Sequence, residues 1–195
     1  MIRSLDDAWN WYTAIKTLSH DINRLAAKWD DPALADVLGR DNRFRERTAA
    51  DLQDMSRTIL ADLDDLTVLV LFSVFEATVR EQAKADVDRE ITLIRHPAVL
   101  RAVKELKETI ENGSFGRVVE AFQKIDEDLT AQVHQVRKFR NWVAHGRREA
   151  PENQVDPERA NDRLRRYLDK LTELNAETTS TSPRILDVNS PTESP

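Results

Sequence analysis

The sequence contains no cysteine, and this absence removes several classes of protein from consideration. Without cysteine there is no disulfide framework, no thiolate metal site and no cysteine nucleophile. The longest uncharged apolar run, LTVLVLFSVF at 66–75, has about half the length that a membrane helix needs. The first residues, MIRSLDDAWNW, lack the basic and then apolar pattern of a signal peptide. We therefore expect a cytoplasmic protein with no membrane partner.

Glycine is also scarce, with four residues in a chain of 195, and the prolines lie outside the periodic segments. Such a shortage of breakers favours an all-α chain. The length corresponds to about one domain, which is enough to bury a core.

Apolar residues at helical spacing predict an antiparallel, up-and-down bundle of four to five main helices. The first helix starts at Leu5, and the second lies in the breaker-free segment 48–90, with a bend expected near 62–65. The run 66–75 is apolar almost all round, so we expect it to be the central buried helix. The apolar positions that define these two helices are Leu5, Ala8, Tyr12, Ile15, Leu18, Ile22, Leu25, Leu52, Met55, Ile59, Leu63, Leu66, Val70, Phe75 and Val79.

Breakers mark the ends of the later helices. One helix opens at His96–Pro97, runs through Ile110 and closes at Asn112–Gly113. The next spans 128–145, where Gly146 suits the C-terminal cap. The last opens at Pro157, a residue favoured in the first turn of a helix, and is expected to end near Leu174.

The remaining segments connect or follow these helices. We expect a polar connection at 29–47 and a short extra helix within 116–125. The helices then form one domain over 1–175. The Ser/Thr/Pro-rich segment 176–195 has the composition of a disordered tail.

Positive charge is concentrated in the stretch VRKFRNWVAHGRR at 136–148. The formal net charge of −6 argues against a general nucleic-acid coat, because such binding needs a broad cationic surface. From Arg137 to Arg148, however, there are five cationic residues and no acidic one. This local asymmetry leaves room for a basic site in an acidic protein.

Arg140 occupies a position where the helical pattern calls for an apolar residue. On a helical wheel it falls inside the stripe formed by Leu129, Val133, Val136 and Val143. A structural interpretation pairs it with a core carboxylate, because an unpaired buried charge is very costly, and Glu76 is the obvious candidate. In the same interpretation His145, Arg147 and Arg148 are solvated cations favoured by the dipole at the helix C-terminus.

Other chemistries find less support in the sequence. The four histidines show no metal-ligand spacing, and there is neither a glycine-rich phosphate loop nor a Gly-x-Ser-x-Gly elbow. The adjacent Asp64 and Asp65 are interpreted as solvated charge rather than a catalytic dyad. We therefore expect no metal and no cofactor.

The stretch FRNWVAHG resembles the signature of the HEPN family of helical domains. That signature is Arg, four to six residues and then His, often with Asn directly after the Arg. Here Arg140 and His145 have four residues between them, and Asn141 follows the arginine. SVFEATVRE at 73–81 and PERANDRLRRYLDKLTEL at 157–174 also resemble family segments. The resemblance covers roughly 5–174, with its specificity in the motif.

The resemblance implies a metal-independent endoribonuclease of the toxin or defence type, acting as a homodimer in which two motifs meet in one cleft. It implies Arg140 and His145 as the catalytic pair, supported by Asn141. Glu76 would hold the Arg140 guanidinium, and Arg137 and Arg148 are expected either to bind substrate or to support the catalytic residues. The substrate would be tRNA, mRNA or rRNA, and an antitoxin or regulatory partner would restrain the enzyme.

Two alternatives stay open. One is a non-catalytic HEPN-like module that dimerises or binds nucleotide or RNA within a larger system. The other is a plain structural bundle. The enzyme hypothesis carries one geometric difficulty: on a regular helix Arg140 and His145 diverge by roughly 140°.

Overall fold

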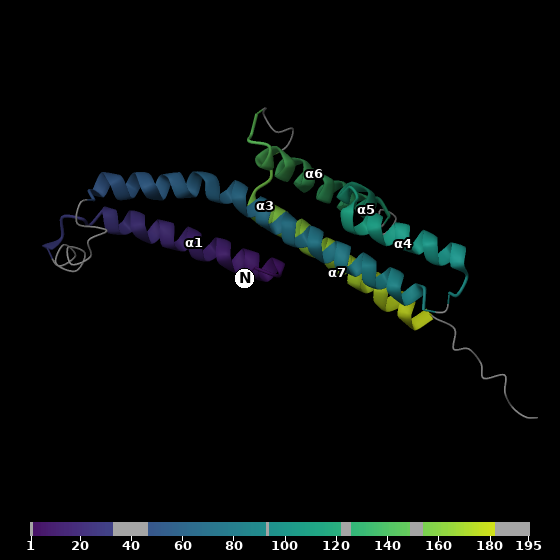
Figure 1. Ribbon diagram of the computed structural model, residues 1–195. Helices are drawn as coiled ribbons and strands as arrows, with labels where there is room; N and C mark the ends of the chain where they lie inside the picture. The colour runs from purple at the N-terminus through teal and green to yellow at the C-terminus, as the bar shows by residue number, and fades with distance from the viewer. Residues whose placement is uncertain (1, 33–46, 93, 122–125, 149–153, 182–195) are drawn as a thin grey trace, which may run out of the picture.

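The computed structural model describes residues 2–32, 47–92, 94–121, 126–148 and 154–181, and within these ranges every regular element is an α-helix. The all-α prediction is therefore confirmed. The helices are α1 (Leu5–Ala26), α3 (Ala49–Glu90), α4 (Pro97–Asn112), α5 (Phe115–Ala121), α6 (Glu127–Ala144) and α7 (Pro157–Thr181), as labelled in Figure 1.

Local side-chain bonds fix where the helices begin. Ser4 and Asp7 form a capping box at the start of α1, since each side chain accepts a bond from the backbone N–H of the other. Thr48 and Asp51 repeat this arrangement at α3. At α6 the Asp126 carboxylate accepts from a backbone N–H of the first turn, 2.8 Å away.

Proline also marks the predicted starts. Pro97 and Pro157 are the first residues of α4 and α7, and Gly113 caps the end of α4. These boundaries follow the sequence because proline at the first helical position loses no hydrogen bond there.

Two boundaries differ from expectation. The helix α3 continues for 42 residues without a break at 62–65, so it is about 63 Å long, and Figure 1 shows only a gentle curve. The helix α7 extends to Thr181, so the segment 176–195, expected to be disordered, begins as helix. The connection around 33–46 and the residues after 181 lie outside the described ranges.

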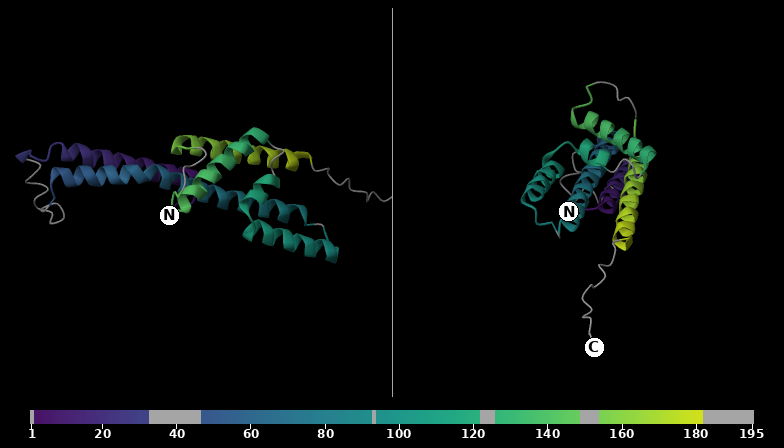
Figure 2. Two further views of the ribbon diagram at one scale, coloured as in Figure 1. Left: turned by 90° about the horizontal axis from the view of Figure 1, so that it is seen from above. Right: turned by 90° about the vertical axis from the view of Figure 1, so that its right-hand side faces the viewer.

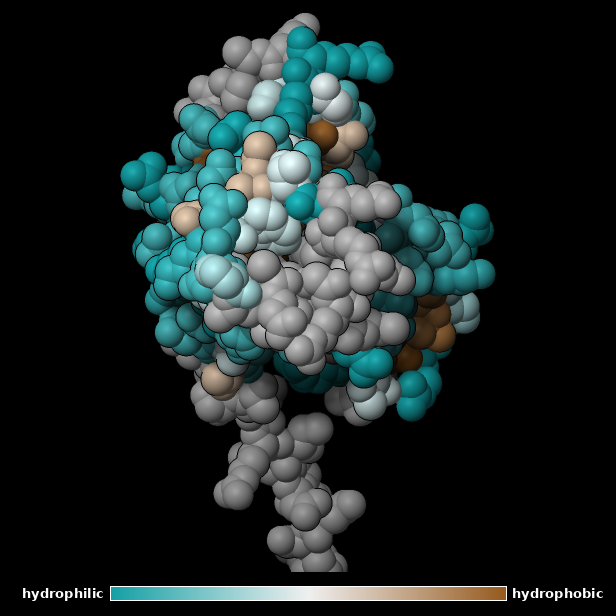
Figure 3. All heavy atoms as spheres, turned by 90° about the vertical axis from the view of Figure 1, so that its left-hand side faces the viewer, coloured by the Kyte–Doolittle hydropathy of each residue, from teal (hydrophilic) through white to brown (hydrophobic). Residues whose placement is uncertain are grey.

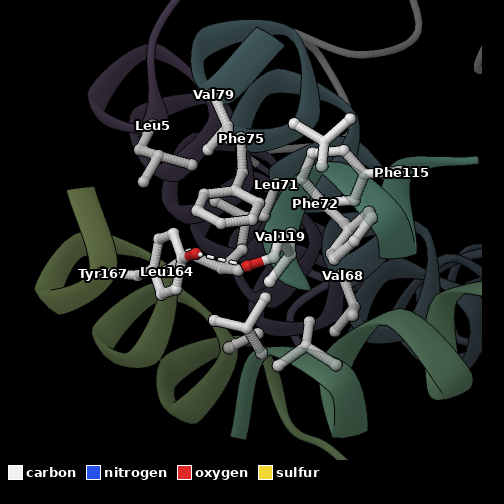
Figure 4. Packing of buried hydrophobic residues seen from close by; sticks show 14 of the residues in the cluster. Leu5, Val68, Leu71, Phe72, Phe75, Val79, Phe115, Val119, Leu164 and Tyr167 are labelled. Carbon is white, nitrogen blue, oxygen red and sulfur yellow. Dashed lines mark hydrogen bonds between the residues drawn. The ribbon is translucent and has the colours of Figure 1, made fainter. Parts of the chain in front are cut away.

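The core is built around the C-terminal half of α3. Phe72 and Phe75 of α3, Phe115 of α5 and Tyr167 of α7 form a cluster of edge-to-face rings with centroids 5.5–5.8 Å apart (Figure 4). Such geometry lets the positive ring edges face the negative ring faces. Figure 2 shows α4 and α7 on different sides of α3, so this half of the helix is the centre of the fold.

The N-terminal half of α3 has a different environment. It pairs with α1 in an antiparallel hairpin, and the outer part of this hairpin extends beyond the other described helices (Figures 1 and 2). Five apolar residues of the hairpin helices are consequently exposed, although their spacing placed them on the packed faces: Leu18, Leu25, Met55, Ile59 and Leu66. Two helices alone cannot cover both apolar flanks of their own interface, and this is the physical reason for the difference.

Candidate functional site

Arg140 lies on the face of α6 that is turned toward α3, as its place in the apolar stripe required. Its Nη2 lies 3.3 Å from a carboxylate oxygen of Glu76, and its Nη1 donates to the Asn141 side-chain oxygen at 3.0 Å. The guanidinium carbon is also 5.4 Å from the ring centre of Phe72, a distance at which cation and ring attract. The predicted contact with Glu76 is thus present. The Arg140 side chain nevertheless remains 28% exposed, so it is fixed without being covered.

Glu76 divides its carboxylate between two arginines. One oxygen faces Arg140, and the other accepts two bonds from Arg80, at 2.7 Å and 3.1 Å. Arg80 also donates to the backbone carbonyls of Ile110 and Gly113 at the C-terminal end of α4. Glu76 therefore connects the candidate site to α4 through one shared carboxylate.

Arg80 was not singled out from the sequence. Its spacing of four residues from Glu76 within one helix is the signal that could have identified the pair. Its bonds to α4 carbonyls, by contrast, depend on how the two helices pack.

Asn141 relates to both other motif residues, but through different groups. Its side chain binds Arg140, whereas its backbone carbonyl accepts the backbone N–H of His145 at 2.9 Å. The side chain that was expected to support the pair therefore supports the arginine.

His145 is the C-terminal cap residue of α6 and is exposed. Among the described residues, its side chain has no hydrogen bond or ion pair. Within one chain, then, Arg140 is held against α3 while His145 projects from the helix end.

The chain turns sharply after His145. Gly146 has φ 81° and Arg147 has φ 55°, both in the left-handed region. This turn brings the Arg147 guanidinium to α3, where it pairs with Asp62 at 2.8 Å and Asp65 at 2.9 Å. Burial raises the pKa of the Asp65 carboxyl, and the charge of Arg147 opposes that effect. Arg147 is thus an exposed cation that also connects α3 to the end of α6 through two ion pairs, which its interpretation as a solvated cation did not include.

Asp64 is exposed and Asp65 is half-buried, and each carboxylate also has a partner. Asp64 accepts a hydrogen bond of 2.8 Å from the Tyr12 hydroxyl of α1, while Asp65 faces Arg147. The two carboxylates serve different neighbours because consecutive residues of a helix point about 100° apart. This arrangement does not form a catalytic dyad.

Arg137 and Arg148, the two residues expected to bind substrate or to support the catalytic residues, lie in different environments. Arg137 is half-buried beside α5, where a Cβ at Gly116 would lie 2.4 Å from its Nη1. Arg148 is exposed beyond the end of α6. Of the two, Arg148 is the better placed to meet a large ligand. The glycine at 116 explains how Arg137 fits against α5.

The described residues hold no group of three or more His, Asp or Glu side chains that could bind a metal ion. In those same ranges, no helix combines the length and the hydrophobicity that crossing a membrane requires.

The motif residues therefore fall into two parts, an anchored Arg140–Asn141–Glu76 group and an exposed His145 at the end of the same helix. Comparison with protein-family models, with curated proteins and with solved structures gives no match to this chain.

Proposed function

We propose that this protein is a metal-independent endoribonuclease with a HEPN-like helical bundle, acting as a homodimer on cellular RNA. The observation that carries the proposal is the state of Arg140. Glu76 and Asn141 fix its guanidinium, yet the side chain stays partly exposed on the helix that ends in the exposed His145. A fixed cation and a free imidazole are the two groups that cleavage of RNA without a metal requires.

The reaction follows from the chemistry of RNA. The ribose 2′-oxygen attacks the adjacent phosphorus, a new O2′–P bond forms, and the P–O5′ bond breaks. His145 takes the 2′-hydroxyl proton or supplies a proton to the departing 5′-oxygen, because an imidazole ring can both accept and donate a proton. Arg140 stabilises the charge on the phosphate oxygens, since a guanidinium stays ionised and binds them with two N–H groups. The products carry 2′,3′-cyclic phosphate and 5′-hydroxyl ends.

A site shared between two subunits resolves the geometric difficulty of the motif. Arg140 faces α3 and His145 projects from the end of α6, so one chain presents the two groups in different directions. In a twofold dimer, the arginine of one subunit can lie beside the histidine of the other. Residues in a composite site of this kind need not converge within a single helix.

The test is cleavage of varied RNAs by the purified protein in EDTA, with analysis of the fragment ends. His145→Ala and Arg140→Ala should each abolish cleavage. Arg101→Ala is the matched control, because Arg101 lies on the exposed face of α4 with a side chain 84% exposed. The proposal is supported if wild type and the Arg101→Ala control give cyclic-phosphate ends and the other two variants do not. Equal cleavage by His145→Ala places the catalytic group elsewhere.

A non-catalytic RNA- or nucleotide-binding module is the second candidate. The observation that favours it is that Arg140 already has a carboxylate partner, as a purely structural arginine would. This candidate predicts affinity for RNA without cleavage, and loss of that affinity when Arg148 is replaced by alanine. A gel-shift assay with the EDTA cleavage reactions run in parallel separates the two functions.

A further inference from the structure

The outer part of the α1–α3 hairpin carries an exposed apolar stripe. Its members are Leu18 and Leu25 of α1 with Met55, Ile59 and Leu66 of α3, each between 38% and 57% exposed. Figure 3, which looks at the end of the hairpin, shows a mainly hydrophilic surface with hydrophobic atoms gathered at few places.

The residues of the stripe lie on one side of the hairpin. Ser19 and Ser56 mark the facing sides of the two helices, because the Ser56 hydroxyl donates to the Ser19 carbonyl at 2.8 Å. Leu18 and Met55 each precede these residues by one position, which is a rotation of about 100°. Antiparallel helices wind in opposite senses when viewed along one axis, so equal rotations from the facing sides point to the same side of the pair.

The other stripe residues point the same way as these two. On α1, Leu25 follows Leu18 by two helical turns and so lies on the same face. On α3, Ile59 and Leu66 are rotated from the direction of Ser56 by up to about 80°, toward the side of Met55. From Met55 to Leu66 the stripe is about 17 Å long. This length corresponds to about three turns of a third helix lying along the stripe.

Charge on the hairpin selects among possible occupants. The described hairpin segments 16–31 and 47–65 contain five Lys or Arg and eight Asp residues, and Arg147 from the end of α6 pairs with Asp62 and Asp65. A second copy of the chain would bring the same acidic surplus against this one, which opposes self-association through the stripe. A helix with basic residues beside its apolar face would meet opposite charge instead.

We propose that the outer α1–α3 hairpin is a docking surface for a basic amphipathic helix of a partner protein. The helix seats its apolar face between Leu18 and Ile59. Its Lys or Arg residues face the exposed carboxylates of Asp21 and Asp54, where they compete with Arg24 and Arg57 of the hairpin, which pair with these carboxylates in the free chain. Leu18, Met55 and Ile59 lie on the half of the hairpin remote from Glu76, while Leu66 at the inner end follows Asp65, which pairs with Arg147. The proposal does not depend on RNase activity.

The experiment measures binding of a labelled synthetic helix of about sixteen residues, with leucines at a and d positions and lysines elsewhere. A second peptide has the same leucines with glutamates in place of the lysines. Fluorescence anisotropy at physiological salt gives the affinity of the full chain for each peptide. The stripe variant is Leu18→Gln/Ile59→Gln, and the control variant is Val99→Gln/Leu100→Gln on α4, where the leucine and valine are similarly exposed.

The expected result is binding of the lysine peptide that is weakened by about tenfold or more in the stripe variant, with a change below about twofold in the control. Circular dichroism checks that both variants are folded. Three results overturn the proposal: no binding of the lysine peptide, equal binding of the glutamate peptide, or equal loss in the α4 control. A wild-type dimer that the stripe variant converts to monomer also overturns it, because the stripe would then be occupied by a second copy.

Discussion

At the residue scale, the candidate site rests on one carboxylate shared by two arginines. Glu76 has a separate oxygen for Arg80 and for Arg140, so each arginine can be removed while the carboxylate keeps a partner. The effect of losing Arg140 on the free energy of unfolding can therefore be measured separately from its effect on the proposed RNA cleavage.

Replacing Arg140 with leucine should therefore leave the free energy of unfolding within about 1 kcal/mol of wild type, because leucine continues the apolar stripe and Glu76 keeps Arg80. Replacing Arg80 with leucine should cost about 2–3 kcal/mol, since it leaves the end of α4 without its donors. Urea denaturation of the two variants checks this difference. A larger loss in Arg140→Leu would show that this arginine, and not Arg80, holds the region together.

Tyr167 predicts how stability depends on alkaline pH. Burial raises the pKa of Tyr167 to about 12 from an ordinary value of 10.0. The folded chain therefore holds this proton more tightly than the unfolded chain. The resulting stability is fully present below about pH 10 and is lost as pH rises to about 12, a change of about 2.7 kcal/mol.

Tyr167→Phe should flatten that decline, as measured by urea unfolding on both sides of pH 10. A smaller decline in stability should persist in this variant, because burial also raises the pKa of Tyr12. The hydrogen bond that Lys16 donates to Tyr12 likewise raises the pKa of Lys16. Both of these contributions decrease in the same direction as pH rises. An unchanged pH profile in Tyr167→Phe would contradict the assignment.

Part of the residue-scale arrangement could be predicted from the sequence. Arg140 was an exception in an apolar stripe, and the cost of an unpaired charge pointed to Glu76. Arg147 could not be predicted in the same way. Its partners Asp62 and Asp65 come within reach only through the left-handed turn at 146–147, and no periodic pattern encodes that turn.

At the scale of elements, the end of α6 determines where His145 projects. Gly146 has φ 81°, which costs glycine nothing but strains residues with a Cβ. The space around this glycine is open, since an added Cβ would meet no atom within 4 Å. Any cost of substitution there comes from the backbone alone.

Gly146→Ala should therefore destabilise the protein by about 1 kcal/mol, whereas Gly146→Asn should cost less because asparagine tolerates the left-handed conformation. Thermal unfolding of both variants measures the difference. If the two substitutions cost the same, the backbone at 146 is not what limits them. Gly113→Ala offers a contrast, because an added Cβ at that position would lie 2.4 Å from the Thr109 carbonyl oxygen.

Helix boundaries were the most predictable feature at this scale. Prolines at 97 and 157 and glycines at 113 and 146 lie where the sequence placed helix ends, since these residues restrict the backbone locally. The continuity of α3 was less predictable. Three aspartates at 62–65 suggested a bend, but Arg147 and Tyr12 engage them from outside, so the helix has no need to break.

At the scale of the whole molecule, the proposed function requires two subunits, and this gives a direct test. Arg140→Ala and His145→Ala are each expected to be inactive. If the site combines the arginine of one subunit with the histidine of the other, a mixed dimer regains one intact site. Random exchange of equal amounts should then restore about a quarter of wild-type cleavage, because half of the dimers are mixed and each has one good site of two.

The check is an RNA cleavage assay on the mixture after the subunits have been allowed to exchange. The two variants assayed separately at the same total concentration are the control. No recovery in the mixture, with subunit exchange verified, would place the arginine and histidine of a working site within one chain.

The exposure of the hairpin could not be predicted from its own sequence. Leu18, Met55 and Ile59 fit a helical apolar face as well as Leu5 or Leu63 does, and spacing alone does not reveal how many neighbours a helix has. Only the placement of α4, α6 and α7 around the other half of α3 distinguishes the buried residues from the exposed ones. Periodicity thus predicts a face, while burial depends on the complete fold.

The unbroken length of α3 constrains how this protein can change in evolution. Leu63 faces α1 in the hairpin, and Glu76 faces α6 in the body, on one rigid helix. Deleting a single residue between them would rotate the hairpin by about 100° relative to the body, whereas deleting seven would rotate it by only about 20°. Related chains should therefore vary in length here in steps of seven residues, or else keep the spacing unchanged.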